Sequence, residues 1–382
     1  MRPRRRRSRD KVMIRQALER FLDRLAPQPR PQVSPMVAER VRAKPLTIAD
    51  VGAAMGVDPR FGALLPQGLC RFLTFEPDAR SQEAAENGVR VFGCALGAEQ
   101  GQETLFLTAG PFASSLKPHN TALLSRYAVW PWHLPAGEVQ VDVARMDDVL
   151  ADSPDWQPDF IKTDVEGADL DVLTGGEKTL HDALGVQAEV AFVERHTGTP
   201  LFAEIDQYLR AQGFMLFQLP GDHWLRGNLV AGPSSRPQLV WADAVYFRDI
   251  DDMRERLRAL DAAGREQMLS RFVLLLVSYG AHDFAVETVQ AMRAAELVAP
   301  ELATALDQDI RASAQPPFAY TARQVLAVSV MSLIYLVGWP AGGRVRGVLK
   351  TLLKQRATVL FHHLYRVAGR GGLENSCYTD LP

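Results

Sequence analysis

The stretch LTIADVGAAMG, residues 46–56, joins a short apolar run to a glycine turn. The run suits a buried strand, and Gly52 and Gly56 permit a tight turn and a close backbone approach to a ligand. Helical stretches at 169–184 and 201–212 separate several later apolar runs. Those runs, each bounded by Gly, Asp or Pro, are 70–75, 89–94, 140–143, 160–163, 186–193, 214–219 and 239–247. The alternation predicts an α/β fold with a mostly parallel sheet and helices on both faces.

The chain divides into three predicted parts. Residues 1–44 form a basic arm with short helices, residues 45–249 form the sheet domain, and residues 250–382 form a helical extension. The extension contains an apolar run at 324–339 and a basic amphipathic stretch at 344–356. Two interpretations of these last segments stay open, a core hairpin and an element that lies at a membrane surface.

The net charge of −2 conceals two basic ends and an acidic body. Residues 1–30 carry +8 and residues 340–382 carry +5, which leaves −15 for residues 31–339. A basic arm is either a solvated tail or a contact with anionic lipid at the inner membrane face. The acidic body would repel phosphate, so no nucleic-acid partner is expected.

The cysteines and histidines predict neither a disulfide framework nor a metal site. Cys70, Cys94 and Cys377 are scattered, with no C-x-x-C pair, and no H-E-x-x-H motif is present. Three separate cysteines favour a reducing compartment, so a cytoplasmic location is expected.

A carboxylate follows the second predicted strand. Glu76 stands about 20 residues beyond the glycine turn, where an acidic residue can accept hydrogen bonds from both hydroxyls of a ribose. In this order the two features predict a ligand with an adenosine ribose, such as a nicotinamide dinucleotide or S-adenosylmethionine. Ala54 replaces the second glycine of the dinucleotide fingerprint. That glycine lets the backbone approach a pyrophosphate, so its absence favours S-adenosylmethionine and disfavours a dinucleotide oxidoreductase.

Further segments in order make the chain resemble the FkbM family of S-adenosylmethionine-dependent methyltransferases over roughly residues 45–249. Its most specific match is the I-K-x-D-x-E-G-A pattern in FIKTDVEGAD at 160–169. The other matching segments are IADVGA at 48–53, FEP at 75–77, ALG at 95–97, SSL at 114–116, MDDVL at 146–150, VLTGG at 172–176 and LVWADA at 239–244. The resemblance implies a Rossmann-like class I methyltransferase sheet of seven strands. It also implies transfer of a methyl group to a hydroxyl of a glycan, glycolipid or related natural product. Ala54 and Met55 depart from the family pattern at a position where the resemblance implies a side-chain contact with the cofactor.

The resemblance and the chemistry of the side chains together predict the site residues. The candidates for binding S-adenosylmethionine are Asp50, Gly52, Ala53, Gly56, Glu76 and Asp164. The candidates for deprotonating the acceptor hydroxyl are Asp164, Glu166, Glu189 and His196. Structural alternatives stay open: Asp50 and Asp164 can cap the turn or helix that follows them, and Glu166 can be the acidic residue of a first helical turn. Glu189, within an apolar strand, requires a partner if it is buried.

Two functions from different classes follow. The first is an O-methyltransferase for a small-molecule or glycan acceptor. The alternative is a catalytically inactive binding or scaffold protein with the methyltransferase fold at the membrane surface, suggested by the departure at residues 54–55.

Overall fold

The computed structural model describes residues 30–53, 58, 60–78, 88–110, 113–227 and 237–314, together with residues 325 and 329. Residues 31–310 form one compact unit. Residues 1–29 of the predicted basic arm, Gly56, and nearly all of the segments at 324–339 and 344–356 lie outside the described residues.

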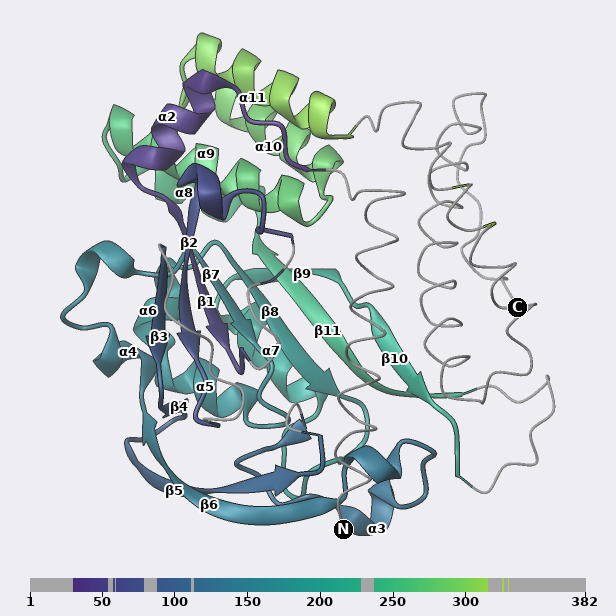
Figure 1. Cartoon of the computed structure of the whole chain (residues 1–382). Helices are drawn as coiled ribbons and strands as arrows, with labels where there is room; N and C mark the ends of the chain where they lie inside the picture. Colours follow the sequence, from purple (N-terminus) through teal and green to yellow (C-terminus); the bar gives the residue numbers. More distant parts are fainter. Residues whose placement is uncertain are drawn as a thin grey trace. The chain divides into compact units, whose positions relative to one another are not determined.

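An eight-stranded sheet forms the centre of the unit (Figure 1). Its strands are β1 (Leu46–Val51), β2 (Cys70–Phe75), β3 (Val89–Phe92), β7 (Phe160–Thr163), β8 (Gly185–Ala191), β9 (Phe214–Gln218), β10 (Gly221–Trp224) and β11 (Gln238–Arg248). They lie in the order β10-β11-β8-β7-β1-β2-β3, and β9 also pairs with β11. Strands β3, β2, β1, β7 and β8 are parallel, whereas β11 runs antiparallel to β8. The predicted α/β fold is therefore confirmed.

The order of the strands reverses at β1. The chain moves from β1 outward to β2 and β3, and later returns to place β7 and β8 on the other side of β1. Such a reversal leaves a crevice outside the carboxyl ends of the strands, where open α/β sheets bind their ligands. The topology thus predicts a ligand site beyond the carboxyl end of β1.

A second, three-stranded sheet has the order β4-β6-β5. It contains β4 (Ala95–Leu96), β5 (Gly101–Thr108) and β6 (Pro135–Ala144). The predicted strand at 140–143 is part of β6, in this sheet and not in the large one. Strand β6 is mostly exposed, so it does not have the continuous apolar sequence of a strand covered on both faces.

Helices cover both faces of the large sheet, and alternate residues along the strands divide between them. Ala49 and Val51 belong to the core under α4 (Met146–Val149), α5 (Asp169–Gly175), α6 (Glu177–Asp182) and α7 (Phe202–Ala211). Leu46 and Ile48 belong to the opposite core, as the period of two along a strand requires. Shorter helices lie in the connections: η1 (Leu65–Gln67), α3 (Thr121–Leu124), η3 (Trp130–Trp132) and η4 (Pro154–Trp156).

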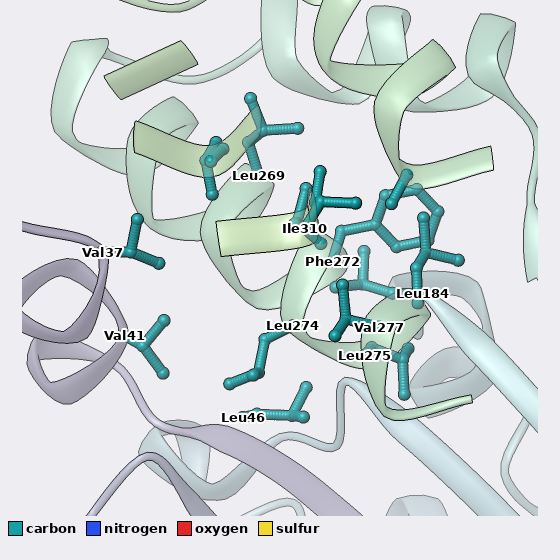
Figure 2. Packing of buried hydrophobic residues seen from close by; sticks show 14 of the residues in the cluster. Val37, Val41, Leu46, Leu184, Leu269, Phe272, Leu274, Leu275, Val277 and Ile310 are labelled. Atoms are coloured by element: carbon teal, nitrogen blue, oxygen red, sulfur yellow. The ribbon is translucent and has the colours of Figure 1, made fainter. Parts of the chain in front are cut away.

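The opposite core contains residues of four helices that follow the sheet within the described range 237–314, together with the helix before β1. These helices are α2 (Pro35–Ala43), α8 (Ile250–Arg258), α9 (Ala262–Ser278), α10 (His282–Ala294) and α11 (Pro300–Ala314). Figure 2 shows Val37 and Val41 of α2 in the same cluster as Leu46 of β1 and Leu274 of α9. Residues on either side of the predicted boundary at 249 and 250 therefore share one core, while the division into three parts stays a prediction.

Helix α9 lies at the centre of this cluster. All nine residues from Leu269 to Val277 are buried, including Arg271. The helix begins at Asp261, whose side chain accepts a hydrogen bond from Gly264 N at 2.7 Å, a favourable N-cap. Within the described part of the chain, no helix combines the length and the apolar character needed to cross a membrane.

Candidate active site

A pocket lies at the reversal point of the sheet, beyond the carboxyl ends of β1, β2 and β7. Its lining comes from these strand ends, from β4 and β5, and from the segment after β5. The lining residues are Val51, Gly52, Phe75, Glu76, Pro77, Asp78, Ala95, Leu96, Leu105, Ser114, Ser115, Leu116, Asp164 and Val165. Three of the predicted site residues, Gly52, Glu76 and Asp164, therefore meet in one pocket, although they lie far apart in the sequence.

Gly52 forms part of the floor of this pocket. Its φ is +85°, and a Cβ atom there would lie 2.1 Å from the carbonyl oxygen of Asp164. The Gly52 amide donates to Phe75 O at 2.9 Å, and the Asp164 amide donates to Val51 O at 3.0 Å. The backbone of Gly52 thus closely approaches the end of β7, and this contact already accounts for a glycine at this position. Ala53, the next predicted residue, is 6% exposed.

Asp50 and Asp164 are joined by a lysine that the sequence analysis did not include in the site. Lys162 Nζ lies 2.9 Å from Asp50 Oδ1 and 3.7 Å from Asp164 Oδ2. Burial alone would lower the pKa of Lys162, but the charges of Asp50 and Asp164 outweigh it and raise that pKa. Burial raises the pKa of Asp50, and the neighbouring ammonium opposes this rise. Asp50 is 1% exposed, so it supports the floor of the pocket, whereas the Asp164 side chain is 42% exposed.

Glu76 follows β2, as expected, and its carboxylate is fixed by the adjacent backbone. Glu76 Oε1 accepts a hydrogen bond from Asp78 N at 2.7 Å, and Glu76 N donates to Phe92 O at 3.1 Å. Both acidic residues line the pocket, and they are 7% and 8% exposed. A carboxylate held in this way is oriented before a ligand arrives.

Glu166 and Glu189 both bind one arginine that sequence reasoning missed. Arg195 Nη1 lies 2.8 Å from Glu166 Oε2, and Arg195 Nη2 lies 2.8 Å from Glu189 Oε1. All three side chains are nearly sealed from solvent. Burial raises the pKa of Glu166 to about 7 against the opposing charge of Arg195, and it raises the pKa of Glu189 well above its ordinary value. The sequence indicated such a cation only through the expectation that a buried Glu189 requires a partner. It did not indicate that the partner is Arg195.

His196 lies beside this group and does not line the pocket. The residue is 2% exposed, and its ring centroid lies 4.9 Å from that of His119. Burial lowers the pKa of His196 well below its ordinary value, and the charge of Arg195 adds to that effect. The imidazole is therefore neutral at pH 7, and its predicted role as a general base stays a prediction.

The segment after β5 is bound to the loops that follow β7 and β8. Ser115 Oγ donates to Glu166 O at 2.7 Å, and Asn120 N donates to Arg195 O at 2.9 Å. Ser115 lines the pocket together with residues of β4 and β5. The three-stranded sheet and the segment after β5 therefore close the side of the crevice opposite the strand ends. Within the described ranges, no three His, Cys, Asp or Glu side chains are placed to hold a metal ion.

A parallel sheet that reverses at β1, with carboxylates at the reversal point, defines a Rossmann-like α/β protein. Residues 50–216 match the family model described as the methyltransferase FkbM domain. The chain therefore carries a methyltransferase domain of the FkbM family. Comparisons with curated proteins and with solved structures gave no match.

Proposed function

We propose that the protein is an S-adenosylmethionine-dependent O-methyltransferase that acts on a hydroxyl of a glycan, glycolipid or related natural product. The observation that carries the proposal is the meeting of Glu76 and Asp164 in one pocket at the reversal point of the sheet. Glu76 is placed to accept hydrogen bonds from the ribose hydroxyls, as acidic residues after the second strand do in this fold class. Asp164 also lines the pocket, and Lys162 connects it to the buried Asp50.

The residues of the pocket fit such a ligand. Glu76 is held by Asp78 N, Asp78 lines the pocket beside it, and Asp164 contributes a third, more exposed carboxylate. Three acidic residues favour a ligand with a cationic centre and two neighbouring hydroxyls over one with a pyrophosphate. S-adenosylmethionine has both features.

The chemistry divides between the ligand and the chain. S-adenosylmethionine supplies a methyl group on a sulfonium, which is already an activated leaving group. The chain has to hold the acceptor oxygen in line with the methyl group and to receive the hydroxyl proton. The candidates for the second task remain Asp164, Glu166, Glu189 and His196, and Asp164 is the one among them that lines the pocket.

Replacing Glu76 by Ala tests the assignment of the ribose contact. The variant should bind S-adenosylmethionine more weakly by about 1.5–3 kcal/mol, because a hydrogen bond to a charged group contributes that much. Isothermal titration calorimetry measures the change, with Glu138→Ala on the exposed strand β6 as the matched control. Unchanged affinity in a folded Glu76→Ala protein would remove the assignment.

Titrations with NAD and with S-adenosylmethionine, together with an assay of methyl transfer, separate the alternative functions. Tighter binding of NAD than of S-adenosylmethionine would favour an oxidoreductase. Binding of S-adenosylmethionine, with no transfer of labelled methyl to cellular glycans, lipids or small molecules, would favour the inactive binding or scaffold protein.

We also propose a peripheral contact with anionic membrane through the basic ends, which carry +8 over residues 1–30 and +5 over residues 340–382. The protein should sediment with vesicles that contain phosphatidylserine and be partly released by salt, since salt screens only the electrostatic share of binding. Deletion of residues 1–10 should reduce sedimentation without unfolding the sheet domain. Equal binding to neutral and anionic vesicles, or none to either, would contradict the proposal.

A further inference from the structure

Arg195 connects two loops that follow neighbouring strands. The loop after β7 contributes Glu166, and β8 itself contributes Glu189. The guanidinium uses separate nitrogens for the two carboxylates, both at 2.8 Å, and Arg195 is 3% exposed. The planar fork of an arginine engages two carboxylates through separate nitrogens, whereas a lysine has a single nitrogen to offer.

The two carboxylates differ in the surroundings of the oxygen atom that Arg195 does not bind. Glu189 Oε2 is completely buried and has no hydrogen-bond partner. Among the described residues, no donor binds Glu166 Oε1, and that oxygen is not one of the completely buried unpartnered atoms. Glu189 Oε2 is therefore enclosed without a partner, whereas Glu166 Oε1 has no donor among the described residues and is not completely buried.

The backbone at Glu166 is held in an uncommon conformation. Its φ is +55°, in the left-handed region that is unfavourable for a non-glycine residue. Such a conformation persists where surrounding contacts fix it. Here they are the ion pair to Arg195 and the hydrogen bond from Ser115 Oγ to Glu166 O. Since Ser115, Asp164 and Val165 line the pocket, these contacts fix Glu166 directly beside it.

We propose that Arg195 is a positioning residue, which holds the Glu166 carboxylate ready to accept the proton of the acceptor hydroxyl. The inference rests on the proposed function. In the transfer step, the hydroxyl oxygen forms a bond to the methyl carbon while the methyl–sulfur bond breaks and its electron pair stays on sulfur. The hydroxyl proton passes to Glu166, so a sulfonium and a carboxylate become a thioether and a carboxylic acid, and charge is conserved.

The charges around Glu166 make its proton affinity depend on Arg195. Asp164 and Asp169 face it from its own loop and the start of α5, and Glu189 faces Arg195 from β8. The rings of His119, His133 and His196 lie near the guanidinium, and burial lowers the pKa of each. Arg195 is thus the cation that opposes several buried carboxylates. Its removal should make Glu166 bind its proton more tightly, since an opposite charge at this range lowers the pKa of a carboxyl.

The test follows the titration of Glu166 by NMR in protein labelled with ¹³C at the glutamate side-chain carboxyl carbon. The resonance of Glu166 is the one that disappears in Glu166→Gln. In wild type it should titrate near pH 7, and in Arg195→Gln its midpoint should move upward by about one to three pH units. Arg195→Lys should give a smaller upward movement, because it retains the charge without the fork. Lys117→Gln, which removes a cation paired with Asp171 at 2.6 Å, should leave the midpoint unchanged.

A second measurement separates this inference from the proposed function. The pH profile of methyl transfer should rise through the Glu166 midpoint and move to higher pH in Arg195→Lys, while the affinity for S-adenosylmethionine stays within about twofold. A Glu166 midpoint that is the same in wild type and in folded Arg195 variants would overturn the role of Arg195. If Arg195→Gln does not fold, the Glu166 midpoint in Arg195→Lys is compared with that of wild type. An unchanged midpoint again overturns the role of Arg195. A wild-type protein that binds no S-adenosylmethionine would instead reject the proposed function.

Discussion

Glu166→Gln should bind S-adenosylmethionine as wild type does and lose methyl transfer by about 10²–10⁴-fold, the usual contribution of a general base. The amide has nearly the shape of the carboxyl group and cannot accept the hydroxyl proton. Burial raises the pKa of Glu166 to about 7, so in wild type the carboxyl exchanges its proton near neutral pH. Transfer from tritiated S-adenosylmethionine into an acceptor fraction that wild type methylates measures the loss.

Asp164→Asn is the matched comparison, because Asp164 lines the same pocket and carries an exposed carboxylate paired with Lys162. If Asp164 is the base, its amide variant shows the large loss and Glu166→Gln does not. Full activity in both variants would exclude both residues as the base and leave Glu189 and His196. Those two are 5% and 2% exposed, so they are more deeply buried than Asp164.

Sequence periodicity predicted most of the large sheet because its strands are covered on both faces. The apolar runs at 46–51, 70–75 and 160–163 coincide with β1, β2 and β7. Strand β10, with the sequence Gly-Asp-His-Trp, has no apolar run and was not predicted. Strand β6 was predicted in part, but a strand exposed to solvent gives no signal of which sheet it joins. The resemblance implied seven strands, and β10 brings the sheet to eight.

The site was predictable where its residues end strands and unpredictable where they depend on pairing across loops. Gly52, Glu76 and Asp164 follow β1, β2 and β7, so parallel pairing alone brings them to one edge of the sheet. Arg195 follows β8 and belongs to no motif, and its contacts with Glu166 and with Glu189 of β8 depend on the folded paths of the loops after β7 and β8. Lys162 lies within β7, and its ammonium forms ion pairs with Asp50 and Asp164, which sequence periodicity does not indicate.

Asp159→Ala should lower the free energy of unfolding by about 3–5 kcal/mol, because it leaves a buried arginine without its partner. Asp159 precedes β7 and accepts hydrogen bonds from Arg271 Nε at 3.0 Å and from Thr47 N at 2.9 Å. Arg271 is 2% exposed in the middle of α9. The aspartate thus joins the amino ends of β1 and β7 to the helices that follow the sheet.

Urea unfolding at neutral pH measures the loss as a lower midpoint with an unchanged slope. The double variant Asp159→Ala with Arg271→Met should recover much of the stability, since it removes the unpaired charge as well as the pair. Arg254→Met is the control: its partner Asp251 is 83% exposed, and a surface ion pair contributes about 0–1 kcal/mol. Because residues on α9 and on the sheet share one core, a single transition is expected for both. Separate transitions for the helices and the sheet, or a loss in Asp159→Ala no larger than in Arg254→Met, would show that this buried pair does not couple them.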